Sequence, residues 1–301
     1  MLVIACPGQG SQTPGFMAPW LEIEEYSKQI DSLSDASGLD LRLHGTTSGA
    51  DTIRDTAIAQ PLIVAASIAS AGLLGGGWSG VAGHSVGEIS AASIAGILSP
   101  EAAIKLVRKR GDEMASAAAL ETTSMAAILG GETESVLASL EALALTPANF
   151  NGAGQIVAAG SKAAIEGLAA NPPAGARVIP LQVAGAFHTH YMSPAVSALA
   201  DYASGVDTGE PAVTIWSNQA AQVVTSGAEF LRLIVGQVAN PVRWDLCMDA
   251  MVAAGVTAMI EVSPAGALAG LAKRAMPGIE VLALKSPDQI DAAKQLIKNH
   301  A

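Results

Sequence analysis

The chain has 301 residues, of which 50% are hydrophobic and only 14% are charged. A chain of this length can bury a large core, and this composition excludes disordered and collagen-like proteins. The net charge of −11 argues against nucleic acid as a partner, because binding to phosphates requires clustered Lys and Arg. Cys6 and Cys247 show neither metal-ligand nor CxxC spacing, so we expect a reducing cytoplasm and no bound metal.

The first apolar segments of the chain predict buried strands and a buried helix. Residues 1–6 form an apolar run without a basic start, too short for a secretory signal, so they predict a first β-strand. Residues 57–87 carry no formal charge and are long enough to cross a bilayer. Pro61 and a triple glycine interrupt this second stretch. We therefore expect a buried helix, a turn and a buried strand, and no membrane span.

Short apolar runs, each ended by Gly, Pro or Ser, alternate with helical patterns along the rest of the chain. The runs cover residues 2–6, 80–83, 258–262 and 280–284, and the clearest helical patterns cover residues 100–118 and 245–254. Such an alternation predicts an α/β protein in which helices cover both faces of a parallel sheet.

The pattern changes between residues 122 and 187. Segments there follow the order strand 124–130, helix 132–144, strands 148–150 and 155–159, helix 162–169 and strand 177–183. This βαββαβ order is that of the ferredoxin-like, split βαβ arrangement. We therefore expect a core formed by residues 1–121 and 188–301, with residues 122–187 inserted into it as a ferredoxin-like subdomain.

Residues 83–87 read Gly-His-Ser-Val-Gly, a GxSxG sequence between an expected strand and an expected helix. In α/β-hydrolases such a sequence places a nucleophilic serine on a sharp turn, where the two glycines let strand and helix approach closely. The N–H groups at the start of the helix can then face an oxyanion. Ser85 is therefore the candidate nucleophile, and the alternative is an ordinary serine in a glycine-flanked loop.

A nucleophilic serine needs a base, and the chain has only five histidines. His84 is adjacent to Ser85, and neighbouring side chains on a tight turn diverge. His188 and His190 remain as candidates, and the pattern alone does not separate them. No acidic residue stands out to orient the histidine, so a complete hydrolase triad is not predicted. A glycine-rich turn at residues 7–12 is a possible source of a second N–H opposite Ser85.

Several short motifs occur in order along nearly the whole chain. They are Pro-Gly-Gln-Gly-Ser-Gln at 7–12, Gln-Pro at 60–61, Gly-His-Ser-Val-Gly-Glu at 83–88, Arg-Gly at 110–111, Ala-Phe-His at 186–188 and Gln-Val-Ala-Asn-Pro-Val-Arg-Trp at 237–244. Together they resemble the malonyl-CoA:acyl carrier protein transacylase family of acyltransferases. The resemblance implies an α/β-hydrolase-like parallel-sheet core with a ferredoxin-like insertion, in agreement with the segment order above.

The resemblance also assigns the reacting groups. It implies that Ser85 is acylated and that His188 is the general base. It implies an oxyanion hole formed by the N–H groups of Gln9 and Val86. A main-chain carbonyl at Gln237 would orient the histidine, which accounts for the acidic residue that the pattern lacks.

Three further positions are implied to bind substrate: Arg110, Gln60 and Phe187. A malonyl carboxylate costs several kcal/mol to desolvate without a partner, and a planar guanidinium meets it with two parallel hydrogen bonds. The charge pattern by itself favours a different interpretation of Arg110, as one exposed cation among the charges on a helix. Phe187 resembles the bulky residue of malonyl-selective enzymes, where it would crowd an α-methyl branch.

The resemblance implies a cytoplasmic, monomeric acyltransferase without a bound cofactor. It would move malonyl from malonyl-CoA to Ser85 and then to the 4'-phosphopantetheine thiol of acyl carrier protein, for fatty acid biosynthesis. One alternative is malonyl transfer for polyketide synthesis or malonate decarboxylation. Others are a serine thioesterase or esterase on the same core, and an inert subunit that binds acyl carrier protein.

Overall fold

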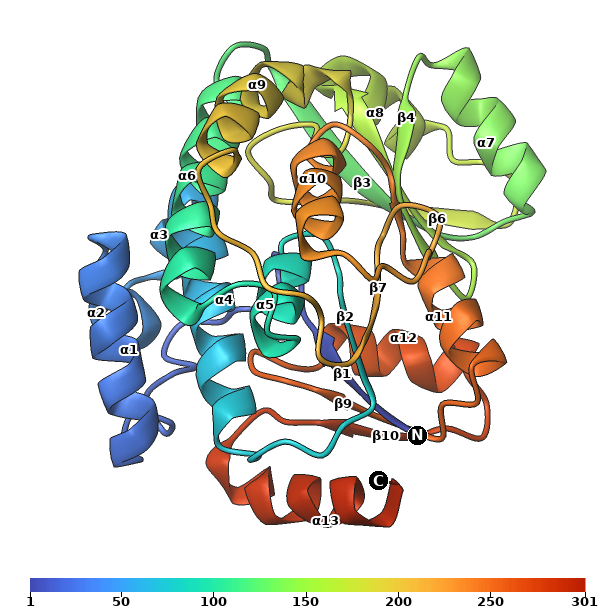
Figure 1. The fold of residues 1–301 in the computed structure, drawn as a ribbon. Coiled ribbons are helices and arrows are strands. Elements are labelled where there is room, and N and C mark those ends of the chain that lie inside the picture. The colour runs from blue at the N-terminus through green and yellow to red at the C-terminus, as the bar shows by residue number, and fades with distance from the viewer. Residues whose placement is uncertain (301) are drawn as a thin grey trace.

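The computed structural model describes residues 1–300, and two five-stranded sheets organise it (Figure 1). The core sheet has the strand order β10-β9-β1-β2-β7, and all its pairs are parallel. Its strands are β1 (Leu2–Cys6), β2 (Gly80–Gly83), β7 (Thr214–Trp216), β9 (Ala258–Glu261) and β10 (Glu280–Ala283). The parallel sheet expected from the sequence is confirmed, and β7 is an edge strand that the sequence analysis missed.

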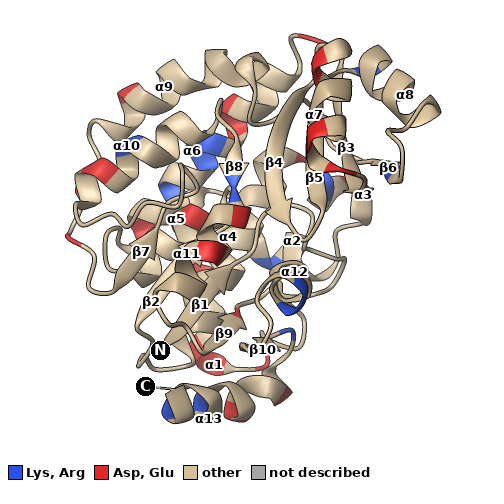
Figure 2. Ribbon diagram, turned by 90° about the vertical axis from the view of Figure 1, so that its right-hand side faces the viewer, with Lys and Arg blue, Asp and Glu red and all other residues tan. Residues whose placement is uncertain are grey.

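Helices cover both faces of the core sheet. Leu2 and Ile4 belong to one hydrophobic cluster and Val3 to another, because successive side chains of β1 point to opposite faces. The first cluster includes residues of α4 (Thr56–Gly72), α5 (Gly87–Ile94) and α6 (Pro100–Ala118), and the second includes residues of α11 (Trp244–Ala253) and α12 (Ala267–Ala275). Burial on both faces explains why β1 and β2 contain no charged residue, as Figure 2 shows.

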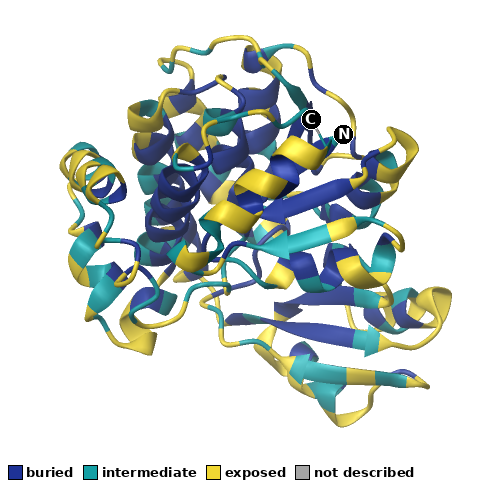
Figure 3. Cartoon of the chain, turned by 90° about the horizontal axis from the view of Figure 1, so that it is seen from below, coloured by how far each residue is buried: buried dark blue, intermediate teal, exposed yellow. Residues whose placement is uncertain are grey.

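The remaining helices surround this layered core. They are α1 (Glu24–Ser37), α2 (Leu41–Thr46), α3 (Ala50–Arg54), α9 (Ser193–Ala203), α10 (Gly227–Gln237) and α13 (Ile290–His300), with short 3-10 turns at His190–Met192 and Pro287–Gln289. The C-terminal helix α13 buries Ala293, Leu296 and Ile297 on one side and exposes the other (Figure 3). This is the spacing expected of an amphipathic helix.

The uncharged stretch at residues 57–87 forms a helix, a turn and a strand, as expected. It comprises most of α4, the loop after it, strand β2 and the turn that follows. The helix α4 continues through Pro61 and is buried along most of its length, since it packs between α1, α5 and α6. Within residues 1–300, no helix combines the length and the apolar character needed to span a membrane.

The second sheet has the strand order β6-β3-β5-β4-β8. Its strands are β3 (Thr123–Gly130), β4 (Thr146–Gly152), β5 (Gln155–Ser161), β6 (Ala176–Pro180) and β8 (Val242–Arg243). The first four alternate with α7 (Thr133–Ala142) and α8 (Lys162–Ala170), and their spatial order of fourth, first, third and second is that of a ferredoxin-like sheet. The two helices pack on one face of the sheet through Val136, Leu140, Ile165 and Leu168.

The second sheet differs from the sequence analysis in two details. Its last predicted strand, at 177–183, ends at Pro180. Its fifth strand, β8, comes from outside the predicted insertion and pairs parallel with β4. We propose residues 122–187 as the inserted subdomain and residues 1–121 and 188–301 as the core, with β8 as a core segment that extends the inserted sheet.

Candidate active site

A cleft with a volume of about 450 Å³ lies between the core and the second sheet. Its floor is formed by the loops after β1 and β2, which carry Gln9 and Ser85. Met125 and Val157 line it from the second sheet, and α12 closes another side. Loops at the carboxyl ends of parallel strands are where open α/β sheets place their ligands.

Ser85 occupies a strained turn between β2 and α5. It has a φ of 54°, in the left-handed region that non-glycine residues rarely adopt. A Cβ at Gly83 would overlap the backbone of Gly87, and a Cβ at Gly87 would overlap the carbonyl group of Cys6. The GxSxG sequence therefore has a steric cause, since both flanking positions admit only glycine.

Ser85 and His188 lie within hydrogen-bonding distance of each other. The distance from Ser85 Oγ to His188 Nε2 is 2.7 Å, and the distance from His188 Nδ1 to the carbonyl oxygen of Gln237 is 2.8 Å. A carbonyl oxygen can only accept, so Nδ1 carries the proton and Nε2 is left to accept from the serine hydroxyl. Burial, and secondly the charge of Arg110, lower the pKa of His188 to about 3. The imidazole is therefore neutral at neutral pH.

The structure separates the two histidines that the sequence pattern left open. His190 is exposed, and its ring lies against Tyr191 with 4.2 Å between the ring centroids. His84 points away from Ser85 to the second sheet, where its Nε2 lies 2.9 Å from Asn151 Oδ1. Only His188 therefore has the geometry of a base for Ser85.

The backbone N–H groups of Gln9 and Val86 lie in the two loops that form the cleft floor. Gln9 follows β1, and its side-chain Nε2 donates to Thr56 Oγ1 at 3.3 Å, which ties this loop to α4. Val86 immediately precedes α5. Neither backbone N–H donates a hydrogen bond to another group of residues 1–300. Both N–H groups therefore have no hydrogen-bond acceptor among the described residues.

Arg110 is buried beside the serine, with only 1% of its surface exposed. It donates from Nη1 to Gln60 Oε1 at 2.6 Å and from Nη2 to Gln237 Oε1 at 2.9 Å, and Nη2 lies 3.5 Å from Ser85 Oγ. Burial lowers the pKa of Arg110 to about 10, and the nearby Glu88 opposes that shift. The guanidinium is therefore charged at neutral pH.

The interpretation of Arg110 as an exposed cation, which the charge pattern of α6 favours, is wrong. Its neighbours Arg108 and Lys109 do reach solvent, where each pairs with a carboxylate one turn further along the helix. Arg110 instead lies on the inward side with Val107 and Met114. The spacing of three and four residues to these two apolar positions is the signal that places position 110 on the buried face.

The remaining predicted position, Phe187, is buried and lines the cleft next to His188. Gln60 lines it from α4. The structure thus gathers all eight predicted residues in or directly behind one cleft, although they come from six separate segments of the chain.

Two residues behind the serine escaped the sequence analysis. Asn218 Oδ1 accepts from the Ser85 N–H at 2.8 Å, and its Nδ2 donates to the carbonyl oxygen of Gly83 at 2.7 Å. Glu88 Oε1 accepts from the Asn218 N–H at 2.6 Å. Burial raises the pKa of Glu88, while the hydrogen bond from the Asn218 N–H and the charge of Arg110 oppose that rise. The only available signal was the position of Glu88 directly after GxSxG, and no pattern marks Asn218.

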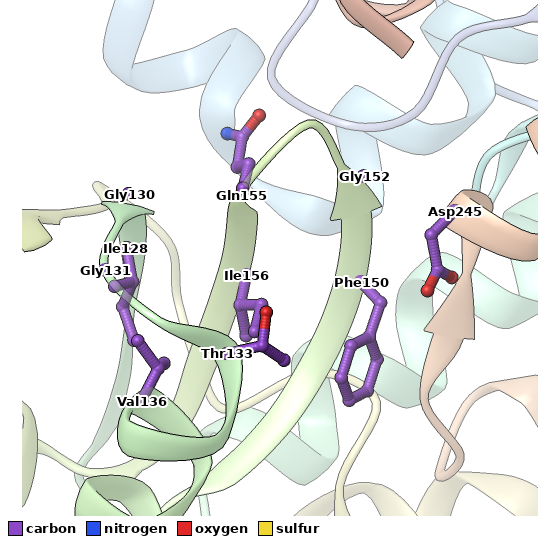
Figure 4. Close-up of a pocket in the computed structure, with 11 residues that line it drawn as sticks. Ile128, Gly130, Gly131, Thr133, Val136, Phe150, Gly152, Gln155, Ile156 and Asp245 are labelled. Carbon is purple, nitrogen blue, oxygen red and sulfur yellow. The ribbon is translucent and has the colours of Figure 1, made fainter.

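A second, smaller pocket lies outside the cleft. It has a volume of about 100 Å³ and lies between α7 and strands β4 and β5 (Figure 4). Its one acidic residue, Asp245, pairs with Arg243 at 2.7 Å, and that guanidinium lies over the ring of Phe150. Residues 1–300 contain no group of three or more His, Cys, Asp or Glu side chains placed to hold a metal ion.

Comparisons with known proteins agree with this geometry. The acyl transferase domain family model matches residues 3–294. The malonyl CoA-acyl carrier protein transacylase of Mycobacterium bovis is 48% identical over 302 aligned residues, which cover 98% of this chain and all of the relative. The crystal structure of MCAT from Mycobacterium tuberculosis is 47% identical, with a TM-score of 0.94 over 98% of this chain and 99% of that one.

A third similar structure contains a partner protein. It is a type II PKS acyl-carrier protein in complex with its malonyl-transacylase. The matched chain of this complex is 30% identical to the present chain, with a TM-score of 0.92 over 98% of this chain and 99% of that one. Both the family model and the identities span nearly the whole chain. The chain therefore belongs to the acyl transferase family, and within it to the malonyl CoA-acyl carrier protein transacylases.

Proposed function

We propose that this enzyme transfers malonyl from malonyl-CoA to Ser85 and then to the 4'-phosphopantetheine thiol of acyl carrier protein. The observation that carries the proposal is the Ser85–His188 pair lying beside a buried, charged Arg110. A base for the serine and a cation for a carboxylate are the two groups that malonyl transfer requires. The names of the similar proteins point to the same reaction.

The first half-reaction acylates the serine. His188 Nε2 takes the hydroxyl proton as Ser85 Oγ attacks the thioester carbonyl of malonyl-CoA. The N–H groups of Gln9 and Val86 stabilise the oxyanion of the tetrahedral intermediate. The intermediate collapses as the C–S bond breaks, the coenzyme A sulfur receives the proton from His188, and a malonyl ester remains on Ser85.

The second half-reaction reverses these roles. His188 takes the proton of the phosphopantetheine thiol, and the sulfur attacks the malonyl ester. The second tetrahedral intermediate expels Ser85 Oγ, which regains its proton from His188. Two substrates that use one site in turn give ping-pong kinetics.

Arg110 and Phe187 would select the acyl group. The guanidinium pairs with the malonyl carboxylate, and Gln60 holds it in position through the 2.6 Å hydrogen bond. Phe187 lies beside His188 and would crowd a branch at the α-carbon of the acyl group. Both features favour malonyl over acetyl and over methylmalonyl.

We further propose that the enzyme acts as a cytoplasmic monomer without a bound cofactor, in fatty acid biosynthesis. Free, buried Cys6 and Cys247 fit a reducing compartment. The large exposed hydrophobic side chains are scattered over separate elements, as on a monomer, and include Leu43, Leu120 and Val223. Size-exclusion chromatography with light scattering tests the oligomeric state.

The decisive experiment is mass spectrometry of the intact protein after mixing with malonyl-CoA. We expect one malonyl adduct, located on the peptide that contains Ser85, and none in the Ser85→Ala variant, which keeps the fold because the turn accepts a small side chain. Addition of the carrier should discharge the adduct onto its thiol. Rapid loss of the adduct to water would instead support a thioesterase, and no adduct at all would support an inert carrier-binding subunit.

A further inference from the structure

The side-chain amide of Gln237 lies between Arg110 and the buried carboxylate of Glu88. Its Oε1 accepts from Arg110 Nη2 at 2.9 Å, and its Nε2 donates to Glu88 Oε2. Arg110 and Glu88 are each 1% exposed and Gln237 is 5% exposed, so water does not screen this row of groups. The side chain of Gln237 therefore acts separately from its main-chain carbonyl, which contacts His188.

Arg110 has only neutral hydrogen-bond acceptors around it. These are the side-chain oxygens of Gln60, Gln237 and Ser85. Arg110 forms no ion pair within residues 1–300, and its Nε has no partner. Glu88 is the acid that influences it most, but one amide group separates the two. A buried cation without a directly bound anion is costly by itself and attracts an anion from outside.

The neighbours of Gln237 fix the direction of its amide. A guanidinium only donates hydrogen bonds, so the amide oxygen must face Arg110. Three oxygens accept from the amide nitrogen: Glu88 Oε2, Asn218 Oδ1 at 3.0 Å and the carbonyl oxygen of Ser85 at 3.2 Å, so the nitrogen must face them. A rotated amide would place its nitrogen against Arg110 and its oxygen against these three acceptors. The arrangement therefore has one stable orientation.

We propose that the Gln237 side chain is a specificity-determining spacer that holds Arg110 in place while keeping the Glu88 carboxylate out of contact with it. The guanidinium then keeps its charge directed at Ser85, where it can receive a carboxylate on the acyl group. A direct Glu88–Arg110 ion pair would compete with that carboxylate. This inference rests on the proposed function, in which Arg110 binds the carboxylate of malonyl.

The main test exchanges the two side chains in the double variant Glu88→Gln, Gln237→Glu. The exchange preserves net charge, side-chain size and the main-chain carbonyl at 237, but it brings a carboxylate into direct contact with Arg110. The readout is the ratio of kcat/KM for Ser85 acylation by malonyl-CoA to that by acetyl-CoA. Since hydrogen bonds to charged groups are the strong ones, we expect this ratio to fall about ten-fold or more, through KM for malonyl-CoA. An unchanged ratio in the folded variant overturns the proposal.

The single variant Glu88→Gln keeps the proposal testable if the double variant does not fold. An amide at position 88 would turn its oxygen to the Asn218 N–H and its nitrogen to Gln237 Nε2, so the Gln237 amide loses one of the acceptors that fix its orientation. We expect the malonyl-to-acetyl ratio to fall several-fold. An unchanged ratio contradicts the proposed role of Glu88 in orienting the amide.

Glu261→Gln is the matched control. Glu261 is also a fully buried glutamate at the end of a core strand, and it accepts from the N–H groups of Gly266, Leu268 and Ala269 rather than reaching Arg110. The malonyl-to-acetyl ratio of kcat/KM does not depend on the fraction of folded enzyme, so we expect the ratio of Glu261→Gln to match that of the wild type. If Glu261→Gln lowers the ratio as much as Glu88→Gln, the effect is general to buried glutamates and the proposal is wrong.

Arg110→Ala separates a failure of this inference from a failure of the proposed function. If it lowers malonyl and acetyl transfer equally, Arg110 does not bind the acyl carboxylate and both proposals fail at that residue. If it lowers malonyl transfer selectively while the double variant keeps its ratio, only the spacer inference fails.

Discussion

In the proposed mechanism, the buried position of His188 determines the pH range over which Ser85 can be acylated. A general base must be neutral, and burial, followed by Arg110, lowers the pKa of this imidazole to about 3. The base is therefore lost only as the pH falls through that low value, rather than through the ordinary histidine pKa of about 6.5.

We predict that Ser85 acylation by acetyl-CoA, which has no acyl carboxylate, keeps its rate between about pH 8 and pH 5. Quenched-flow mass spectrometry of the acyl-enzyme across this range gives the profile. A ten-fold fall per pH unit that begins near the ordinary histidine pKa would contradict the prediction and show an ordinary imidazole.

Two histidines only two positions apart offer a matched pair of variants. His188→Ala should slow acylation by roughly 10²- to 10⁴-fold, because it removes the proton acceptor 2.7 Å from Ser85 Oγ. His190→Ala should have little effect, since that side chain is exposed and packs on Tyr191. Stopped-flow acylation of both variants is the measurement, and equal losses would show that the base is wrongly assigned.

The residues of the site differ in how far the sequence could predict them. Ser85 is evident because its requirements are local, within the five residues of GxSxG. The choice of His188 over His190 depends on a contact across 103 positions of the chain, which no local pattern encodes. Asn218 is a further case, because it lies more than 130 positions along the chain from Ser85 and Gly83, the residues that it contacts.

Helices and strands also differ in whether local sequence or a distant contact determines them. The predicted limits of β1, β2 and α6 match the structure, and breaker residues mark three of them: Pro7 follows β1, Gly83 ends β2 and Ser99 with Pro100 begins α6. The strands β7 and β8 have only three and two residues, and each exists because a neighbouring strand pairs with it. Strands of this length carry no periodicity of their own.

The turn between β2 and α5 gives a prediction at the level of an element. The Gly83→Ala variant should lose roughly 3 kcal/mol or more of unfolding free energy, because its Cβ would overlap the backbone at the start of α5 and force the two elements apart. Acylation should fall with it, since Ser85 would move from His188. Urea denaturation followed by circular dichroism measures the loss.

The matched control is Gly167→Ala on α8. A Cβ there meets no atom within 4 Å, so the substitution should stabilise the helix by about 0.5 to 1 kcal/mol. If Gly83→Ala were tolerated as well as this control, the steric explanation of GxSxG would be wrong.

At the scale of the whole molecule, the type of each sheet could be predicted, because the order of apolar runs and helices distinguishes a parallel sheet from a βαββαβ unit. The relative placement of the two sheets could not be predicted. The two sheets meet where β8, from the C-terminal part of the chain, pairs with β4. Met125 and Val157 of the second sheet line the same cleft as Ser85 of the core.

The charge of the whole molecule leads to a prediction about the carrier. Acyl carrier proteins are acidic, and this chain has a net charge of −11, so their long-range interaction is repulsive and docking requires a local basic surface. Figure 2 shows basic residues on α12 and β6. Arg177, Lys273 and Arg274 are all exposed, and Arg274 also lines the cleft.

We predict that Lys273→Glu and Arg177→Glu raise the KM for the carrier several-fold at low salt, because like charges at the rim of an interface slow association. Acylation by malonyl-CoA should stay near normal, since neither side chain lines the cleft. Lys298→Glu is the control: it makes the same charge change on α13, which contributes no residue to the cleft. Steady-state kinetics with each substrate varied separately, at low and moderate salt, distinguish the effects. An unchanged KM for the carrier in both reversals, or an equal rise in the Lys298 variant, would place the docking surface elsewhere.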